Sequence, residues 1–185
     1  MNIEQIITSV KIKLLQKMPW YGHVLSQLPI IYSTTEVSTL GVGKSKRDDI
    51  LIKLYINPEY VQHVIDDCNK NEQVFVDHFI EVLKHEVLHM LFAHITLEFQ
   101  DKQRQAIACE LSVNSYIDRN KLIPEKNCKK AGVFPEDFKL ESKLGVKEYY
   151  DLLRDNKEFQ KMEKELNQQI AIHIQSGKKE NGNQG

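Results

Sequence analysis

The sequence predicts an α+β fold in which a small sheet packs on helices and one long helix is buried at the centre. Three observations support this. Apolar residues return at helical spacing near the N-terminus, and the run at 50–56 alternates with a period of two. A third segment, Val87 to Ile95, is apolar except for His89 and His94, and a helix that is apolar on nearly all sides is a buried helix.

The expected elements follow from local signals. Pro19 ends the first helix, and the sequence Asn57-Pro58-Glu59 combines a capping residue, a proline at the first helical position and an acid in the first turn. The single lysine of the run at 50–56 favours a strand near a sheet edge. We expect helices at 3–18, 57–67, 74–99, 105–119 and 146–154, strands at 29–33, 37–42 and 50–56, and an irregular segment at 121–142.

Composition excludes several classes of protein. The net charge of -1 leaves no basic excess for binding nucleic acid. A membrane-spanning helix is not expected, because the sequence contains no run of about 18 apolar residues. The three cysteines are an odd number without a CxxC pair, which favours the reducing cytoplasm. With 185 residues, we expect one domain over 1–155, followed at 156–185 by a charged helix and a flexible tail. The charged helix is a candidate docking site for a protein partner.

The motif that carries chemistry is His-Glu-Val-Leu-His at 85–89, an HExxH sequence. On a helix, His85 and His89 lie about 40° apart and one turn apart, so both imidazoles can reach one metal ion. Glu86 lies about 60° from His89, close enough to act on water without being a ligand. Burying three ionisable groups within five residues is costly, and a bound metal ion offsets that cost.

A tetrahedral catalytic zinc needs a third protein ligand, for which two residues compete. His94 lies about 180° around a continuing helix from His85, and no glycine after His89 turns the chain. Enough residues separate His89 from Glu110 for one helix to end, the chain to turn and the next helix to begin. Glu110 sits in an otherwise apolar stripe of that next helix. Asn114, one turn further, could hold a metal-bound histidine through its second ring nitrogen. We therefore predict one zinc ion on His85, His89 and Glu110, with His94 as the alternative third ligand.

This arrangement predicts a zinc-dependent metallopeptidase that hydrolyses peptide bonds of a protein or peptide substrate. Glu86 is the expected general base, and the strand at 50–56 would bind extended substrate if it borders the cleft. The alternative is a binding module on the same scaffold that keeps zinc for stability and has lost turnover. The ligands alone do not distinguish the two.

The chain also resembles the metallopeptidase domain at the N-terminus of VWA-like metallopeptidase proteins, within the zincin class. The resemblance spans about 19–153 and rests on the segments WYGHVLSQLP, YINPEYV, LKHEVLHMLFAH, IACELSVN, LIPE and FPEDFKL…KEYYDLL. It implies a zincin-like fold over 1–155, with His85 and His89 as metal ligands and Glu86 as the catalytic glutamate. Glu110 stands where the family tends to place an aspartate. An arginine usual after the position of His94 and the VWA-like part are both missing here.

Overall fold

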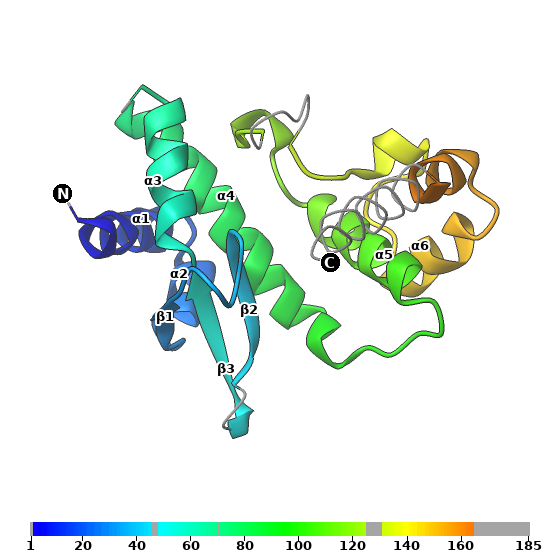
Figure 1. Ribbon diagram of the computed structural model, residues 1–185, viewed down its shortest axis with the longest axis horizontal. Coiled ribbons are helices and arrows are strands. Elements are labelled where there is room, and N and C mark those ends of the chain that lie inside the picture. Colours follow the sequence, from blue (N-terminus) through cyan, green and yellow to red (C-terminus); the bar gives the residue numbers. More distant parts are fainter. Residues whose placement is uncertain (1, 46–47, 70, 125–130, 165–185) are drawn as a thin grey trace, which may run out of the picture.

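The computed structural model describes residues 2–45, 48–69, 71–124 and 131–164. The fold is α+β and dominated by helices, as predicted (Figure 1). In chain order the elements are α1 (Ile3–Lys17), α2 (Pro19–Ser26), β1 (Ile30–Tyr32), β2 (Leu40–Ser45), β3 (Asp48–Ile56), α3 (Pro58–Asp67), α4 (Glu72–Leu91), α5 (Lys102–Asn114) and α6 (Val146–Leu153), with 3₁₀ turns η1 (His94–Thr96), η2 (Arg119–Lys121) and η3 (Pro135–Phe138).

The three described strands form one sheet in the order β1-β3-β2. β1 pairs with β3 in parallel, and β2 pairs with it antiparallel. The prediction of an edge strand at 50–56 was wrong, because β3 is the central strand. Leu54 and Ile56 are fully buried on one face, whereas Lys53 and Tyr55 are only partly buried on the other. The lysine therefore marks the more open face of the sheet and not its edge.

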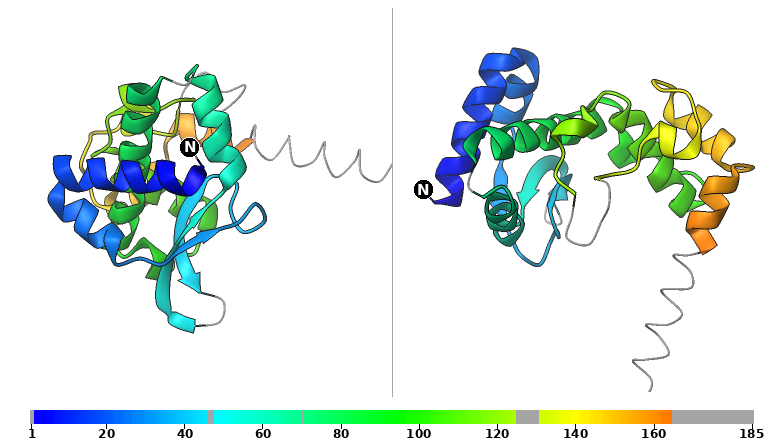
Figure 2. Two further views of the ribbon diagram at one scale, coloured as in Figure 1. Left: turned by 90° about the vertical axis from the view of Figure 1, so that its left-hand side faces the viewer. Right: turned by 90° about the horizontal axis from the view of Figure 1, so that it is seen from above.

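Helix α4 joins two hydrophobic cores. Figure 1 shows α1–α3 and the sheet toward one end of α4, and α5 and α6 toward the other; the right-hand view of Figure 2 shows the same separation. The first core lies between α1, the sheet, α3 and α4, and the second between α5, α6 and the helical residues 157–164. A small third cluster connects the two and consists of Leu88, Val113, Ile117 and Phe134.

Several helix boundaries agree with the local signals. The Asn57 side chain accepts from the Glu59 amide at 2.9 Å and caps α3, as the Asn-Pro-Glu sequence predicts. The helix expected at 105–119 begins earlier, where the Asp101 side chain caps its first turn, and it ends earlier, at Asn114. Beyond α6, residues 157–164 are helical and Phe159 is buried in the second core. The rest of the segment predicted as a docking helix and tail, 165–185, lies outside the described residues.

The main helix ends eight residues before the predicted position of 99. α4 stops at Leu91, and Ala93 adopts the left-handed conformation, with φ of 56°. The sequence offers no glycine or proline here, so local signals alone favour a continuous helix. The turn is fixed instead by contacts made after it, since the Gln105 side chain accepts from the Phe99 amide and donates to the Leu97 carbonyl, both at 2.8 Å.

None of the helices within the described ranges is long and apolar enough to cross a membrane.

The fully buried carboxylate of Glu81 holds the chain that follows α5 against α4. It accepts from the Asp118 amide at 3.1 Å and forms ion pairs with Lys84 at 3.2 Å and Lys121 at 3.5 Å. A buried charge is tolerated when its hydrogen bonds and its charge are both matched. This contact fixes the residues after α5 beside the middle of α4.

A second buried polar group on α4, His78, holds the same segment one turn earlier. Its Nδ1 accepts from the Ile123 amide at 3.1 Å, so Nε2 carries the proton and donates to the Tyr60 hydroxyl at 2.9 Å. Burial lowers the pKa of His78 from 6.5 to about 4. The imidazole is therefore neutral in the folded protein at physiological pH.

This neutral histidine makes stability depend on pH. Between pH 6.5 and about 4 the unfolded chain takes up a proton at His78 that the folded protein does not. The free energy of unfolding should therefore fall as the pH drops through this window, by about 3 kcal/mol from this residue at its lower end. In urea unfolding at several pH values, His78→Gln should lose this part of the pH dependence. The exposed His23→Gln on α2 is the matched control and should keep it; equal profiles for the two variants would contradict the assignment.

Candidate metal centre

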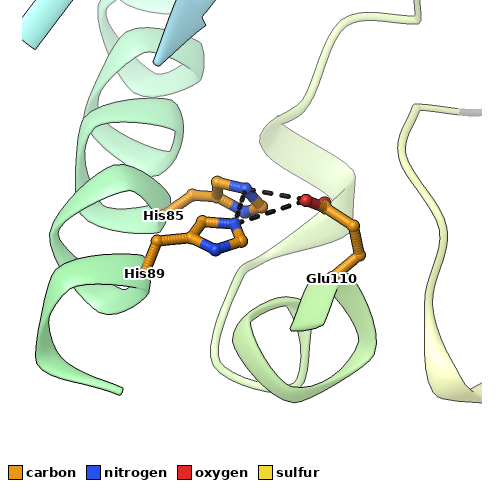
Figure 3. Close-up of side chains that lie close together, drawn as sticks. All are labelled: His85, His89 and Glu110. Atoms are coloured by element: carbon orange, nitrogen blue, oxygen red, sulfur yellow. Dashed lines mark hydrogen bonds and ion pairs between the residues drawn. The ribbon is translucent and has the colours of Figure 1, made fainter. Parts of the chain in front are cut away.

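Two histidines on α4 converge on one point, as the sequence predicts. Their Nε2 atoms lie 2.9 Å apart, because residues four apart occupy the same face on successive helical turns (Figure 3). The side chains of His85 and His89 are 18% and 15% exposed. They are thus held within the protein but can still be reached from one side.

The third residue of the group, Glu110, comes from α5 across the cleft (Figure 3). Its Oε2 lies 3.6 Å from the His85 Nε2, and its Oε1 lies 3.3 Å from the His89 Nε2. An ion bound tetrahedrally with bonds of about 2.0–2.1 Å separates its ligand atoms by about 3.3 Å. The ligand atoms of His85, His89 and Glu110 all lie within 4.8 Å of one another, so this group is close enough to hold one metal ion.

Hydrogen bonds fix which nitrogen of His85 carries a proton. The Asn114 amide nitrogen donates to the Val133 carbonyl at 2.7 Å, so its oxygen faces the histidine. This oxygen can only accept, and it lies 2.8 Å from the His85 Nδ1. The proton of His85 is therefore on Nδ1, and Nε2 presents its lone pair to the cleft. The role suggested for Asn114 by its position one turn after Glu110 agrees with this contact.

The same reasoning applies to His89, starting from a backbone carbonyl. The Ser112 hydroxyl donates its one proton to the Cys109 carbonyl at 2.9 Å, and its oxygen lies 3.2 Å from the His94 Nε2, which must donate to it. Neutral His94 then accepts at Nδ1, which lies 2.9 Å from the His89 Nδ1. His89 therefore donates from Nδ1 and also presents the lone pair of Nε2.

Two lone pairs and a carboxylate thus face one another with no donor between them. This arrangement requires a positive charge at its centre, which a proton or a metal ion can supply. Burial opposes protonation of His89, but the hydrogen bond and the charge of Glu110 outweigh it and raise the pKa of His89. For Glu110, burial is likewise outweighed by the neighbouring histidines, which lower the pKa of its carboxyl. Two imidazoles and one carboxylate match the nitrogen and oxygen ligands of a transition-metal or zinc site.

His94 is close to the site but is not a member of the ligand group within the described residues. On a continuous helix without a glycine after His89, His94 would lie on the face opposite His85. The left-handed Ala93 turns the chain without a glycine, and His94 folds back against His89. Both of its ring nitrogens are engaged, by His89 and by Ser112, so the structure favours Glu110 as the third ligand for a different reason than the sequence did.

Glu86 lies on α4 between the two histidines of the group, and its side chain is buried. The Val42 amide on β2 donates to its Oε2 at 2.8 Å. Burial raises the pKa of Glu86 to about 7, although the Val42 amide and His89 act in the opposite direction. A carboxyl with this pKa can take up and release a proton near neutrality. Sequence reasoning missed Val42 because its contribution is a backbone amide, which every residue except proline carries.

Pockets open on both sides of the ligand group and share Glu110. One of about 460 Å³ lies on the His85 side, where its apolar lining includes Val82, Leu122 and Val133. The other, of about 310 Å³, lies on the His89 side and contains Glu86 and Val42. A further pocket of about 390 Å³, beyond Tyr60, touches none of the candidate ligands. The ligand group therefore lies at the middle of a cleft that is open in two directions.

The ligand assignment predicts a large effect of Glu110→Ala on metal binding. Removing the carboxylate leaves only two imidazoles as ligands. Loss of a hydrogen-bond partner of a metal ligand lowers metal affinity by up to about 100-fold, and loss of the ligand itself should lower the zinc affinity by more than that. Competition with a chromogenic chelator measures this affinity. The exposed Glu98→Ala is the control and should bind zinc as the unsubstituted protein does. Equal affinities for both variants would remove Glu110 from the ligand set.

Comparisons of the chain with protein-family models, with curated proteins and with solved structures find no match. The function is therefore inferred from the geometry of His85, His89, Glu110 and Glu86.

Proposed function

We propose that this protein is a zinc-dependent metallopeptidase with a zincin-like fold. The observation that carries the proposal is the convergence of two imidazole lone pairs and the Glu110 carboxylate beside the buried Glu86. When bound, zinc would polarise a peptide carbonyl and lower the pKa of water toward about 7. Three protein ligands leave one tetrahedral position for this chemistry, which is the arrangement of catalytic rather than structural zinc sites.

Glu86 is the proposed general base. The Val42 amide fixes one of its carboxylate oxygens, and the residue lines the pocket on the His89 side. A base that is held in place and has a pKa of about 7 can take a proton from water and return it to the leaving amine. Its near neighbours on the cleft side are the ligand residues His89 and Glu110, so its proton is exchanged close to the proposed metal ion.

The edge of β2 that pairs with no strand among the described residues is the proposed binding surface for the substrate backbone. The Asn57 amide donates to the Thr39 carbonyl at 2.8 Å, and the register alternates from there, so the backbone groups of Leu40 and Val42 point away from β3. The Val42 amide already points to Glu86. An extended peptide added along this edge would pass in front of Glu86. This replaces the strand at 50–56, which is paired on both sides and cannot accept another strand.

We also propose membership of the metallopeptidase family that the sequence resembles. Glu110 occupies the place of the family's aspartate and lies within reach of both histidines. Its longer side chain spans the distance between α5 and α4, so the exchange keeps the carboxylate at the site. The substrate in this proposal is a protein or peptide.

Glu86→Gln separates an enzyme from a zinc-stabilised binding module. The amide keeps the shape of the side chain and an oxygen for the Val42 amide, but it cannot take up a proton near neutrality. Hydrolysis of a fluorogenic peptide library should fall by about 10²–10⁴-fold while zinc content and unfolding temperature are retained. A matched change on the same helix, Gln73→Glu near the N-terminus of α4, should leave hydrolysis unchanged. Stoichiometric zinc without hydrolysis in the unsubstituted protein would instead support the binding module.

A further inference from the structure

The partner of His89 comes from the turn after its own helix, whereas the partner of His85 comes from α5. α4 ends at Leu91, two residues after His89. His85 is one turn inside the helix and donates to Asn114 on α5. The corresponding contact of His89 is made by His94, whose ring centre lies 5.0 Å from that of His89.

We propose that His94 and Ser112 are positioning residues that fix the His89 ring and its tautomer for metal binding. This inference rests on the proposed metal site, and it assigns neither residue as a ligand. The chain of donors runs from the His89 Nδ1 to the His94 Nδ1, from the His94 Nε2 to the Ser112 hydroxyl, and from there to the Cys109 carbonyl. Because the last acceptor is a carbonyl, each proton in the chain has one place, and the His89 Nε2 is left with its lone pair.

The surroundings of His94 show that it is held in place for this contact. The residue is 9% exposed, and the Phe92 ring packs against it with ring centres 5.6 Å apart. Its backbone position depends on Ala93, which has φ of 56° although it is not glycine. Such a conformation is unfavourable for a residue with a Cβ and persists only where the surrounding contacts require it. The contacts made after Ala93 include those of His94 with His89 and Ser112, in addition to those of Gln105.

The two chains of hydrogen bonds make α5 the element that organises the whole site. Alternate residues of this helix supply three parts of the site. Glu110 is the proposed third ligand, Ser112 accepts from His94 in the chain that begins at His89, and Asn114 is the partner of His85. Metal-bound histidines generally donate their second nitrogen to such a partner, which orients the ring and raises its affinity for the ion. The docking of α5 on α4 should therefore set the orientation of both imidazoles as well as the distance to the carboxylate.

Zinc affinities of a variant series test the inference on the full chain, by chelator competition. His94→Leu removes the acceptor and should lower the affinity by about 10–100-fold. His94→Asn places an amide oxygen near the position of Nδ1 and should recover part of this loss, which a purely structural role would not explain. Ser112→Ala should cause a smaller loss, because His94 can then change tautomer. Ser115→Ala removes a hydroxyl at the C-cap of α5 that contacts the Leu111 carbonyl at 2.8 Å and the Tyr149 hydroxyl at 2.9 Å but none of the histidines, and the zinc affinity should be unchanged.

Imidazole NMR of the labelled, zinc-loaded protein gives a second readout that does not depend on substitutions. We expect His89 to be protonated on Nδ1 and bound to zinc through Nε2, and His94 to be protonated on Nε2 only. The inference would be overturned if the His94→Leu variant bound zinc as tightly as the unsubstituted protein. It would also be overturned if His94 carried its proton on Nδ1 or coordinated the ion. Failure of this inference can be told apart from failure of the proposed function. Absence of zinc binding in the unsubstituted protein refutes both the metal site and the positioning role of His94, whereas zinc binding without peptide hydrolysis refutes only the peptidase activity.

Discussion

The convergence of three acceptors between α4 and α5 is the constraint on which the arrangement of the cleft depends. Two imidazole nitrogens 2.9 Å apart, each presenting a lone pair, face a carboxylate and repel one another unless a positive charge lies between them. A cation at this point would attract groups from both helices at once. Because His85 and His89 lie on α4, whose apolar side chains are in the first core, and Glu110 lies on α5, whose apolar side chains are in the second, the same ion would also connect the two cores.

The connection matters because little apolar surface joins the two cores directly. The cluster of Leu88, Val113, Ile117 and Phe134 is small, and the buried Glu81 and His78 add polar contacts to the chain after α5. The remaining space between α4 and α5 is open and forms the pockets that meet at Glu110. A ligand that binds both helices stabilises the folded arrangement by mass action, so metal binding and the shape of the cleft are linked.

Buried polar groups on one helix serve two different purposes in this protein. Glu81 and His78 are satisfied by partners of fixed geometry and anchor the chain that follows α5. Glu86, also buried, accepts from the Val42 backbone amide, and burial raises its pKa to about 7. A carboxyl of this kind destabilises the folded protein when it ionises, and proteins retain such groups mainly at functional sites. The contrast along α4 distinguishes the residues that position the site from the one proposed to act in it.

The sequence by itself determined the features that depend on local spacing. Four-residue spacing places His85 and His89 on one face, and likewise Glu110 and Asn114, while Asn57 and Pro58 begin α3 where their chemistry requires. Only the tertiary structure decided where α4 ends, that β3 is central, and that Val42 and His94 contact Glu86 and His89. The reason is physical: periodicity and capping act within a few residues, whereas the end of an apolar helix without glycine or proline, strand order and backbone donors are set by packing between segments far apart in the chain.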